Sequence, residues 1–279
     1  MQLSVVIVTF NEEANLARTL ESVKPLVADG KGEIIVVDSG STDRTVETAK
    51  SHGAKVFVEE WKGFAAQKNS AIDKATGAWI LSLDADEELD RDLPALILYV
   101  TSEATHDPRQ ELPTATGVLP VTKADVNGCW IRRRNKFMGR WIEHGGFWPD
   151  PKLRLFRRGA GRFESRLVHE DVHVEGKVGR IRSGALIHHS YPTLSDYIDH
   201  MNRYSSLGAE MVVAKRKVRF SFINIVLRPL FTFVYNYFFR LGFLDGREGL
   251  LLHLYHAVYV SWKYAKAWEL SRQKNTLSS

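Results

Sequence analysis

The feature that most restricts the fold is an alternation of strand-like and helix-like segments over roughly the first ninety residues. Four apolar runs rich in β-branched residues predict strands, and they read LSVVIVTF, EIIVVD, AKVFVE and AWILSLD. The segments between them have helical character, as where Leu16, Leu20 and Val23 share one face of a helix. Because right-handed crossovers join strands that alternate with helices, the pattern predicts an α/β fold with a mostly parallel sheet flanked by helices.

Acidic residues stand where two of these predicted strands end. The second strand ends in Asp38, and the fourth ends in Asp84-Ala85-Asp86. Ligands of such sheets bind at the carboxyl ends of the strands, so we expect these carboxylates to gather on one rim. Asp84 and Asp86 lie two residues apart and face the same way in an extended chain, where they repel unless a cation or hydrogen-bond donors hold them. The pair predicts a Mg²⁺ or Mn²⁺ site that neutralises a departing diphosphate.

Several common nucleotide and hydrolase motifs are missing from the sequence. There is no G-x-G-x-x-G after the first strand, no G-x-x-x-x-G-K-[ST] and no G-x-S-x-G. These absences disfavour a dinucleotide-binding fold, a P-loop phosphotransferase and an α/β-hydrolase. The single cysteine, Cys129, excludes an internal disulfide. A D-x-D pattern alone is a weak signal, but its place at the end of a buried strand favours metal-dependent chemistry on a nucleoside diphosphate.

Three segments in this order and spacing give the sequence a family resemblance: SVVIVTFNEEANL, IIVVDSGSTDRT and WILSLDADEEL. They resemble the family 2 glycosyltransferases, whose GT-A fold is a Rossmann-like, mixed and mostly parallel sheet flanked by helices. Further along, RNKFMGRWIEHGG, LRLFRR, LVHEDV and GFLDGREG resemble a bacterial subgroup related to lipopolysaccharide core glucosyltransferases. The resemblance implies transfer of a sugar with inversion at the anomeric carbon.

The resemblance also implies which residues bind the nucleotide-sugar donor and the metal. Asp86 is expected to be the principal ligand of a Mg²⁺ or Mn²⁺ ion, with Asp84 beside it near the ribose or the donor sugar. Lys68 stands where the family usually has a basic residue that faces the donor. Asp-Ser-Gly replaces the Asp-Asp-Gly of many members and leaves the first acid intact. The expected donor-binding residues are Thr9, Phe10, Asn11, Glu12, Asp38, Lys68 and Asp84.

A catalytic base is expected downstream, in the segment RLVHEDVHVEG. Glu170 and Asp171 stand side by side there, and we place Glu170 first with Asp171 as the alternative. His169 is expected to orient the base or to complete the metal shell. Arg154 and Arg157 of LRLFRR are candidates for contact with the diphosphate or the acceptor, because guanidinium groups bind phosphate well.

The character of the chain changes after residue 190, and two long apolar stretches follow. Residues 220–244 are long enough to cross a bilayer, but they contain Arg228, Pro229 and Arg240. Aromatic residues with arginines at the edges and a basic cluster just before them favour the interface of an acidic membrane. We therefore expect a helical hairpin that docks on a membrane; a buried core hairpin or a dimer face is the alternative.

The resemblance, with the change of character after residue 190, implies a catalytic GT-A domain over residues 1–210 and an amphipathic, membrane-docking tail over 211–279. The predicted reaction moves a hexose from a UDP-linked sugar to a lipid-linked saccharide acceptor in cell-envelope polysaccharide or lipopolysaccharide biosynthesis. It would take place at the cytoplasmic face of the inner membrane, where the enzyme is peripheral or monotopic.

The net charge suggests a class of partner, and two other functions stay open. The net charge of +5 suggests an anionic partner, and no recognised nucleic-acid-binding module is present. A catalytically inactive, membrane-bound scaffold that binds nucleotide sugars stays open. So does a sugar-phosphate nucleotidyltransferase, although that enzyme should carry a Gly- and Arg-rich loop where this chain has TFNEEANL.

Overall fold

The computed structural model describes residues 1–102, 126–164, 171–215 and 218–276, and these residues form two compact units. The first unit contains residues 1–102, 126–133, 150–164 and 171–188. The second contains residues 134–149, 189–215 and 218–276. The boundary predicted between residues 210 and 211 falls inside a single helix, α5 (Leu194–Lys215).

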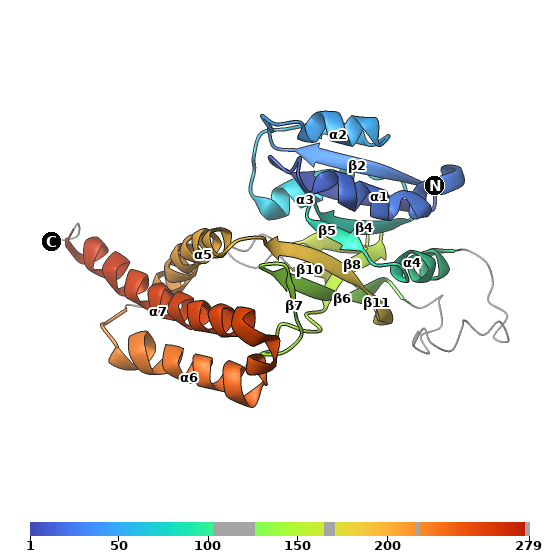
Figure 1. The fold of residues 1–279 in the computed structure, drawn as a ribbon. Coiled ribbons are helices and arrows are strands. Elements are labelled where there is room, and N and C mark those ends of the chain that lie inside the picture. Colours follow the sequence, from blue (N-terminus) through green and yellow to red (C-terminus); the bar gives the residue numbers. More distant parts are fainter. Residues whose placement is uncertain (103–125, 165–170, 216–217, 277–279) are drawn as a thin grey trace. The chain divides into compact units, whose positions relative to one another are not determined.

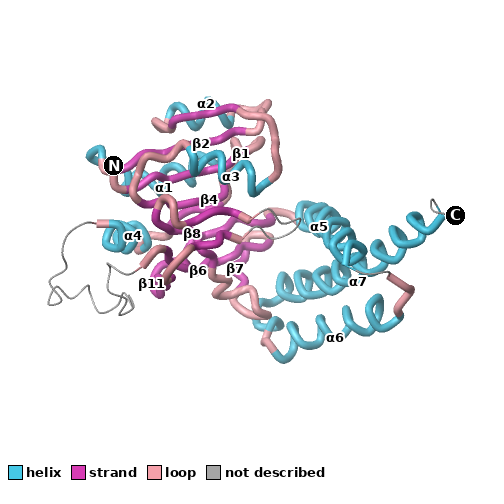
Figure 2. Tube along the Cα trace, turned by 180° about the vertical axis from the view of Figure 1, so that it is seen from behind, coloured by secondary structure: helices cyan, strands magenta, loops and turns pink. Residues whose placement is uncertain are grey.

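A large mixed sheet forms the framework of the fold, in the order β3-β2-β1-β4-β8-β6-β11-β5 (Figures 1 and 2). The four strands predicted near the N-terminus pair in parallel. Strand β8 then runs antiparallel to β4, and β6 runs antiparallel to β8. The bounds are β1 Leu3–Thr9, β2 Gly32–Asp38, β3 Lys55–Val58, β4 Trp79–Asp84, β5 Glu87–Leu89, β6 Gly128–Phe137, β8 Lys152–Arg157 and β11 Val178–Tyr191.

Helices cover both faces of this sheet in the first unit, because successive side chains of a buried strand point to opposite faces. Val5 and Ile7 of β1 pack with Leu20 of α1, whereas Val6 between them packs with Ile72 of α3. Helices α2 and α4 share the α1 side, and the small β9–β10 sheet shares the α3 side. The bounds are α1 Leu16–Val27, η1 Ala28–Gly30, α2 Thr45–Ser51, α3 Phe64–Asp73, α4 Leu93–Thr101, β9 Gly161–Phe163 and β10 Val172–Val174. The predicted α/β class is confirmed.

The second unit is mainly helical and has a small core of its own. Phe137, Ile142, Tyr197 and Leu252 are buried together, and the rings of Phe137 and Tyr197 meet edge to face at 5.3 Å. Helix α7 packs against α5 on one side and against α6 on the other (Figure 1). The bounds are β7 Arg140–Ile142, η4 Ile223–Leu227, α6 Arg228–Val234, η5 Tyr235–Phe239, η6 Gly242–Asp245 and α7 Gly246–Thr276. The predicted C-terminal helical hairpin is therefore present. Over the described residues, the structure contains no helix with the length and apolar character that crossing a bilayer requires.

Two of the subgroup-like segments, EHGG and GFLDGREG, meet inside the second unit. The Asp245 carboxylate accepts the backbone N–H groups of Glu143 and His144 at 3.2 and 2.9 Å. Gly145 has φ of +65°, and a Cβ atom there would lie 1.9 Å from the ring of His253. Only glycine fits at this position, because an added side chain would be strained and would overlap the imidazole.

Candidate functional site

The parallel strands bring the predicted acids to one edge of the sheet. Strand β1 lies between β2 and β4, with Thr9 opposite Asp38 and Val8 opposite Asp84. Thr9, Asp38 and Asp84 therefore stand in neighbouring positions at the carboxyl ends of three strands. This is the edge at which ligands of open α/β sheets bind.

Asp38 is fully buried, and its carboxylate holds the turn that follows β2. One oxygen accepts the backbone N–H groups of Gly40 at 3.0 Å and Ser41 at 2.8 Å. The other accepts the hydroxyl groups of Thr9 at 2.9 Å and Ser41 at 2.5 Å. These four bonds compensate for burying the charge, and they fix the backbone beside the strand ends.

The segment after β1 is tied to the segment after β2. Asn11, at φ 53°, accepts the backbone N–H of Thr42 at 2.9 Å, and the backbone N–H of Glu12 donates to the Thr45 hydroxyl at 2.8 Å. Phe10, which precedes Asn11, is 57% exposed. Burial raises the pKa of Glu12, and the charges of Asp86, Asp43 and Asp84 raise it further. Glu12 therefore belongs to the same acidic surroundings as the D-x-D pair.

Asp84 lies between two buried cations. Lys68 of α3 approaches one carboxylate oxygen at 2.7 Å, and Arg154 of β8 approaches the other at 2.5 Å. Burial alone would raise the pKa of Asp84, but the charges of Arg154 and Lys68 outweigh it and hold that pKa well below its usual range. Asp84 is therefore ionised at neutral pH.

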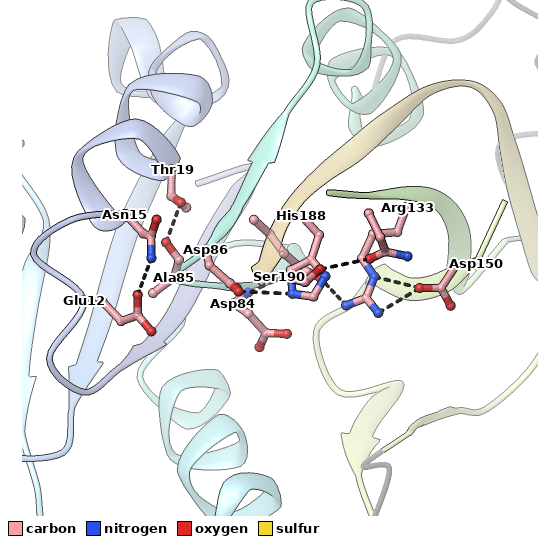
Figure 3. A network of polar contacts seen from close by, with 12 residues as sticks. Glu12, Asn15, Thr19, Asp84, Ala85, Asp86, Arg133, Asp150, His188 and Ser190 are labelled. Carbon is pink, nitrogen blue, oxygen red and sulfur yellow. Dashed lines mark hydrogen bonds and ion pairs between the residues drawn. The ribbon is translucent and has the colours of Figure 1, made fainter. Parts of the chain in front are cut away.

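Glu87 connects this cluster to a second arginine. Its carboxylate accepts the backbone N–H of Asp84 at 3.1 Å, Arg154 at 2.8 Å and Arg133 at 3.0 Å. Arg133 also binds Asp150 at 2.8 Å (Figure 3). Glu87 is completely buried, so its charge requires these partners. The alternating charges fix the backbone of the turn between β4 and β5.

Asp86 faces a histidine from β11 rather than these arginines. His188 Nε2 lies 3.1 Å from Asp86 Oδ2 (Figure 3). Burial would raise the pKa of Asp86, but the charge and hydrogen bond of His188 lower it overall. His188 pairs with Glu87 in the register of β11 with β5, which explains its position. His188 was not among the residues predicted from the sequence, where its only signal is its place near the end of a strand-like piece, ALIHHSY.

Comparison with known proteins identifies the family. Residues 4–160 match the family described as "Glycosyl transferase family 2". The chain belongs to glycosyl transferase family 2. It is similar to "Lipopolysaccharide core biosynthesis glycosyltransferase LpsC" of Rhizobium meliloti (strain 1021), with 31% identity over 275 residues, 96% of this chain and 93% of the relative. An uncharacterized glycosyltransferase of Rickettsia typhi is 30% identical over 281 residues, 100% of this chain and 91% of that protein.

A solved structure agrees with the fold of this family 2 glycosyltransferase. It is the mannosyltransferase PcManGT from Pyrobaculum calidifontis in complex with GDP-Man and Mn²⁺, with a TM-score of 0.51. The match covers 99% of this chain and 87% of that one at 16% identity. The GT-A fold predicted from the sequence is confirmed, and the protein is a glycosyltransferase.

Asp86 and His188 fit a divalent cation in this glycosyltransferase. They present a carboxylate oxygen and an imidazole nitrogen to one another. Mg²⁺ commonly binds through one or two carboxylates plus substrate phosphates, and Asp86 is such a carboxylate. In the described part of the chain, no cluster of three or more His, Cys, Asp or Glu side chains has metal-site geometry. Oxygen atoms of the substrate would have to complete the shell. Of the other two predicted ligands, Asp84 is engaged by Lys68 and Arg154, and His169 lies outside the described residues.

The residues predicted as the catalytic base or beside it are only partly described by the structure. His169 and Glu170 lie outside the described residues. Asp171 is exposed directly before β10, and its backbone oxygen accepts the N–H of Glu164 at 3.3 Å.

The structure does not bring Arg157 together with the acids. Arg157 pairs with Trp79 at the start of β4, whereas Asp84 ends that strand. Its guanidinium covers the Trp79 ring at 4.7 Å and donates to the Val126 carbonyl at 3.2 Å. Arg154 and Arg157 lie in one strand, three positions apart, and this spacing separates their surroundings.

Proposed function

We propose that this glycosyltransferase moves a hexose from a UDP-linked sugar to a saccharide acceptor carried on a lipid, with inversion at the anomeric carbon. The product belongs to cell-envelope polysaccharide or lipopolysaccharide, and the reaction takes place at the cytoplasmic face of the inner membrane. The observation that carries the proposal is the pairing of Asp86 with His188, beside an ionised Asp84 and at the edge formed by Thr9 and Asp38.

The nucleoside would bind where the segments after β1 and β2 meet. Phe10 exposes more than half of its surface there, and an exposed ring can stack on a nucleobase. Thr9, Asn11 and Asp38 are held by hydrogen bonds between the two segments, so the pocket wall is ordered before the donor binds. Glu12 supplies a further acceptor near the D-x-D pair.

The diphosphate would lie over the acidic turn. Asp86 and His188 would hold Mg²⁺ or Mn²⁺, and that cation would neutralise the charge that develops on the leaving diphosphate. Lys68 and Arg154 keep Asp84 ionised and in one orientation. Glu87 fixes the backbone of the turn through the Asp84 N–H.

A carboxylate downstream completes the reaction. It takes the proton of the acceptor hydroxyl while that oxygen bonds to the anomeric carbon and the bond from that carbon to the diphosphate oxygen breaks. Direct displacement inverts the centre and needs no covalent intermediate. Glu170 and Asp171 are the two candidates, and Asp171 is accessible to solvent.

Two observations support a lipid-carried acceptor. The similar protein of Rhizobium meliloti is named for lipopolysaccharide core biosynthesis, whose products are built on a lipid. The net charge of +5 suits work at an anionic surface. Peripheral contact with a membrane follows from such an acceptor.

Substitution of Asp86 tests the proposal. We expect Asp86→Asn to lower kcat/KM for UDP release from a UDP-hexose in Mn²⁺ by about 10²–10³-fold, because a neutral amide binds the cation weakly. UDP affinity measured by calorimetry should lose its dependence on Mn²⁺. Asp73→Asn is the matched control, since Asp73 is an exposed carboxylate paired with Arg162. Full turnover by Asp86→Asn would refute the assignment of the metal site.

A further inference from the structure

Exposed apolar side chains concentrate in one segment of the second unit. Of the 22 large apolar residues that are exposed in the described part of the chain, 15 lie between Phe220 and Leu254. Single exposed apolar residues are normal on a protein surface, but a contiguous group of this size marks an interaction site.

These side chains form a stripe along η4, α6 and η5. Ile223, Phe231 and Phe239 are 64%, 68% and 75% exposed, and they repeat at eight residues. This repeat suits about two turns here, because η4 and η5 are π-helical and their turns are wider than those of an α-helix. The intervening exposed residues follow the same spacing of three or four. We call this set the apolar face: Ile223, Leu227, Leu230, Phe231, Tyr235, Phe238 and Phe239.

The opposite side of the same helical segment is the side that packs on the protein. Pro229 is buried, and the Ser261 hydroxyl of α7 donates to the Ile225 carbonyl at 2.8 Å. The guanidinium of Arg228 covers the Tyr264 ring of α7 at 5.0 Å. A surface helix normally turns its apolar stripe toward the core. This segment does the reverse, so the apolar face is available to something outside the chain.

Charge indicates what covers the apolar face. From Val218 to Leu244 the only charged residues are Arg219, Arg228 and Arg240, and all three are exposed. In a two-fold interface with a second copy, these arginines would face the same arginines of the partner. The segment contains no acid to pair with them. Anionic lipid headgroups offer the opposite charge, and aromatic rings suit the boundary between headgroups and acyl chains.

We propose that the apolar face inserts into the headgroup region of an anionic bilayer, with η4, α6 and η5 lying along the membrane surface. Arg219 and Arg240 bind lipid phosphates at its margin, whereas the guanidinium of Arg228 stays on the Tyr264 ring. This inference rests on the proposed function, in which the acceptor is carried on a lipid. It assigns membrane contact to the first helical arm of the predicted docking hairpin, which is η4, α6 and η5. The second arm, α7, packs between α5 and α6 and supports the first.

Vesicle binding tests the assignment. The protein is sedimented with vesicles of phosphatidylethanolamine and phosphatidylglycerol, and in parallel with vesicles of phosphatidylcholine alone. We expect preferential binding to the anionic vesicles. The double variant Phe231→Ser/Phe239→Ser should bind them about tenfold more weakly or worse, because both anchors are lost. Arg219→Gln should weaken binding about fivefold, the effect of one basic residue at such a surface.

A matched control uses the first unit. Phe57 and Trp61 are 38% and 47% exposed there, and Phe57→Ser/Trp61→Ser should bind vesicles as the wild type does. The melting temperature of each variant shows that it is folded. The assignment is overturned if the wild type binds no vesicle, or if the Phe231→Ser/Phe239→Ser variant binds as tightly as the wild type. A wild-type dimer in sedimentation equilibrium that this variant converts to a monomer would assign the face to a second copy instead.

The outcome is separable from the proposed function. UDP affinity in Mn²⁺, measured without vesicles, should be the same in the wild type and the Phe231→Ser/Phe239→Ser variant. Vesicle binding by a wild type that binds no UDP would refute the proposed reaction and leave the membrane face intact. UDP binding without vesicle binding would do the reverse.

Discussion

The acidic edge around Asp84 and the apolar face depart from the usual distribution of side chains in opposite ways. Around Asp84, carboxylates and guanidinium groups are buried together, and Glu87 has no exposure at all. Along η4, α6 and η5, rings such as Phe231 are mostly exposed. Proteins ordinarily place charge outside and apolar surface inside. Each exception costs free energy, so we infer that both regions are maintained for function and not for folding stability.

The largest expected effect comes from breaking the buried charge network. Arg154→Met should lower the free energy of unfolding by about 3–5 kcal/mol, because Asp84 and Glu87 each lose a buried partner. Urea denaturation measures the change. Arg162→Met is the control, since Arg162 forms an exposed pair with Asp73 and should cost about 1 kcal/mol or less. Equal losses in the two variants would show that burial adds nothing to the cost of removing a charged partner.

A smaller effect tests buried polarity within the unit that carries the apolar face. His253 is buried, and burial with the charges of His256 and Arg240 lowers its pKa to about 4, against the opposing effect of Asp245. The unfolded chain therefore binds more protons between pH 6.5 and 4. Stability should fall as the pH drops through that window.

His253→Gln isolates this contribution. The wild type should lose on the order of 2 kcal/mol more than the variant between pH 7 and pH 4, measured by urea denaturation at each pH. The control is His173→Gln, because the His173 side chain is 67% exposed. An unchanged pH dependence in His253→Gln would assign the acid sensitivity to the carboxylates.

The smallest effect is expected on the apolar face itself. Leu230 is 57% exposed, so Leu230→Ala should change the free energy of unfolding by no more than about 0.5 kcal/mol. The same substitution at Leu20, which is fully buried under the sheet, should cost about 3 kcal/mol. A large loss at Leu230 would mean that the face is covered in solution, and it would weaken the contrast between the two regions.

Much of the fold was predictable because its signals are local. The β-branched runs predicted the four parallel strands, and the acids that end two of them predicted one shared rim. The arginines of LRLFRR show where local signals stop. They look equivalent in sequence, yet strand register sends Arg154 to Asp84 and Arg157 to Trp79.

The sequence alone determined the four N-terminal strands, their parallel pairing and the acidic edge, because strand and helix periodicity and strand ends are properties of neighbouring residues. Tertiary structure decided that His188 meets Asp86, since that contact depends on β11 pairing with β5 across a long separation. It also decided which way the stripe from Ile223 to Phe239 points. The spacing of an amphipathic stripe is the same whether its apolar side faces a core or faces outward. Here the burial of Pro229 and the hydrogen bond from Ser261 of α7 to the Ile225 carbonyl leave the apolar side facing outward.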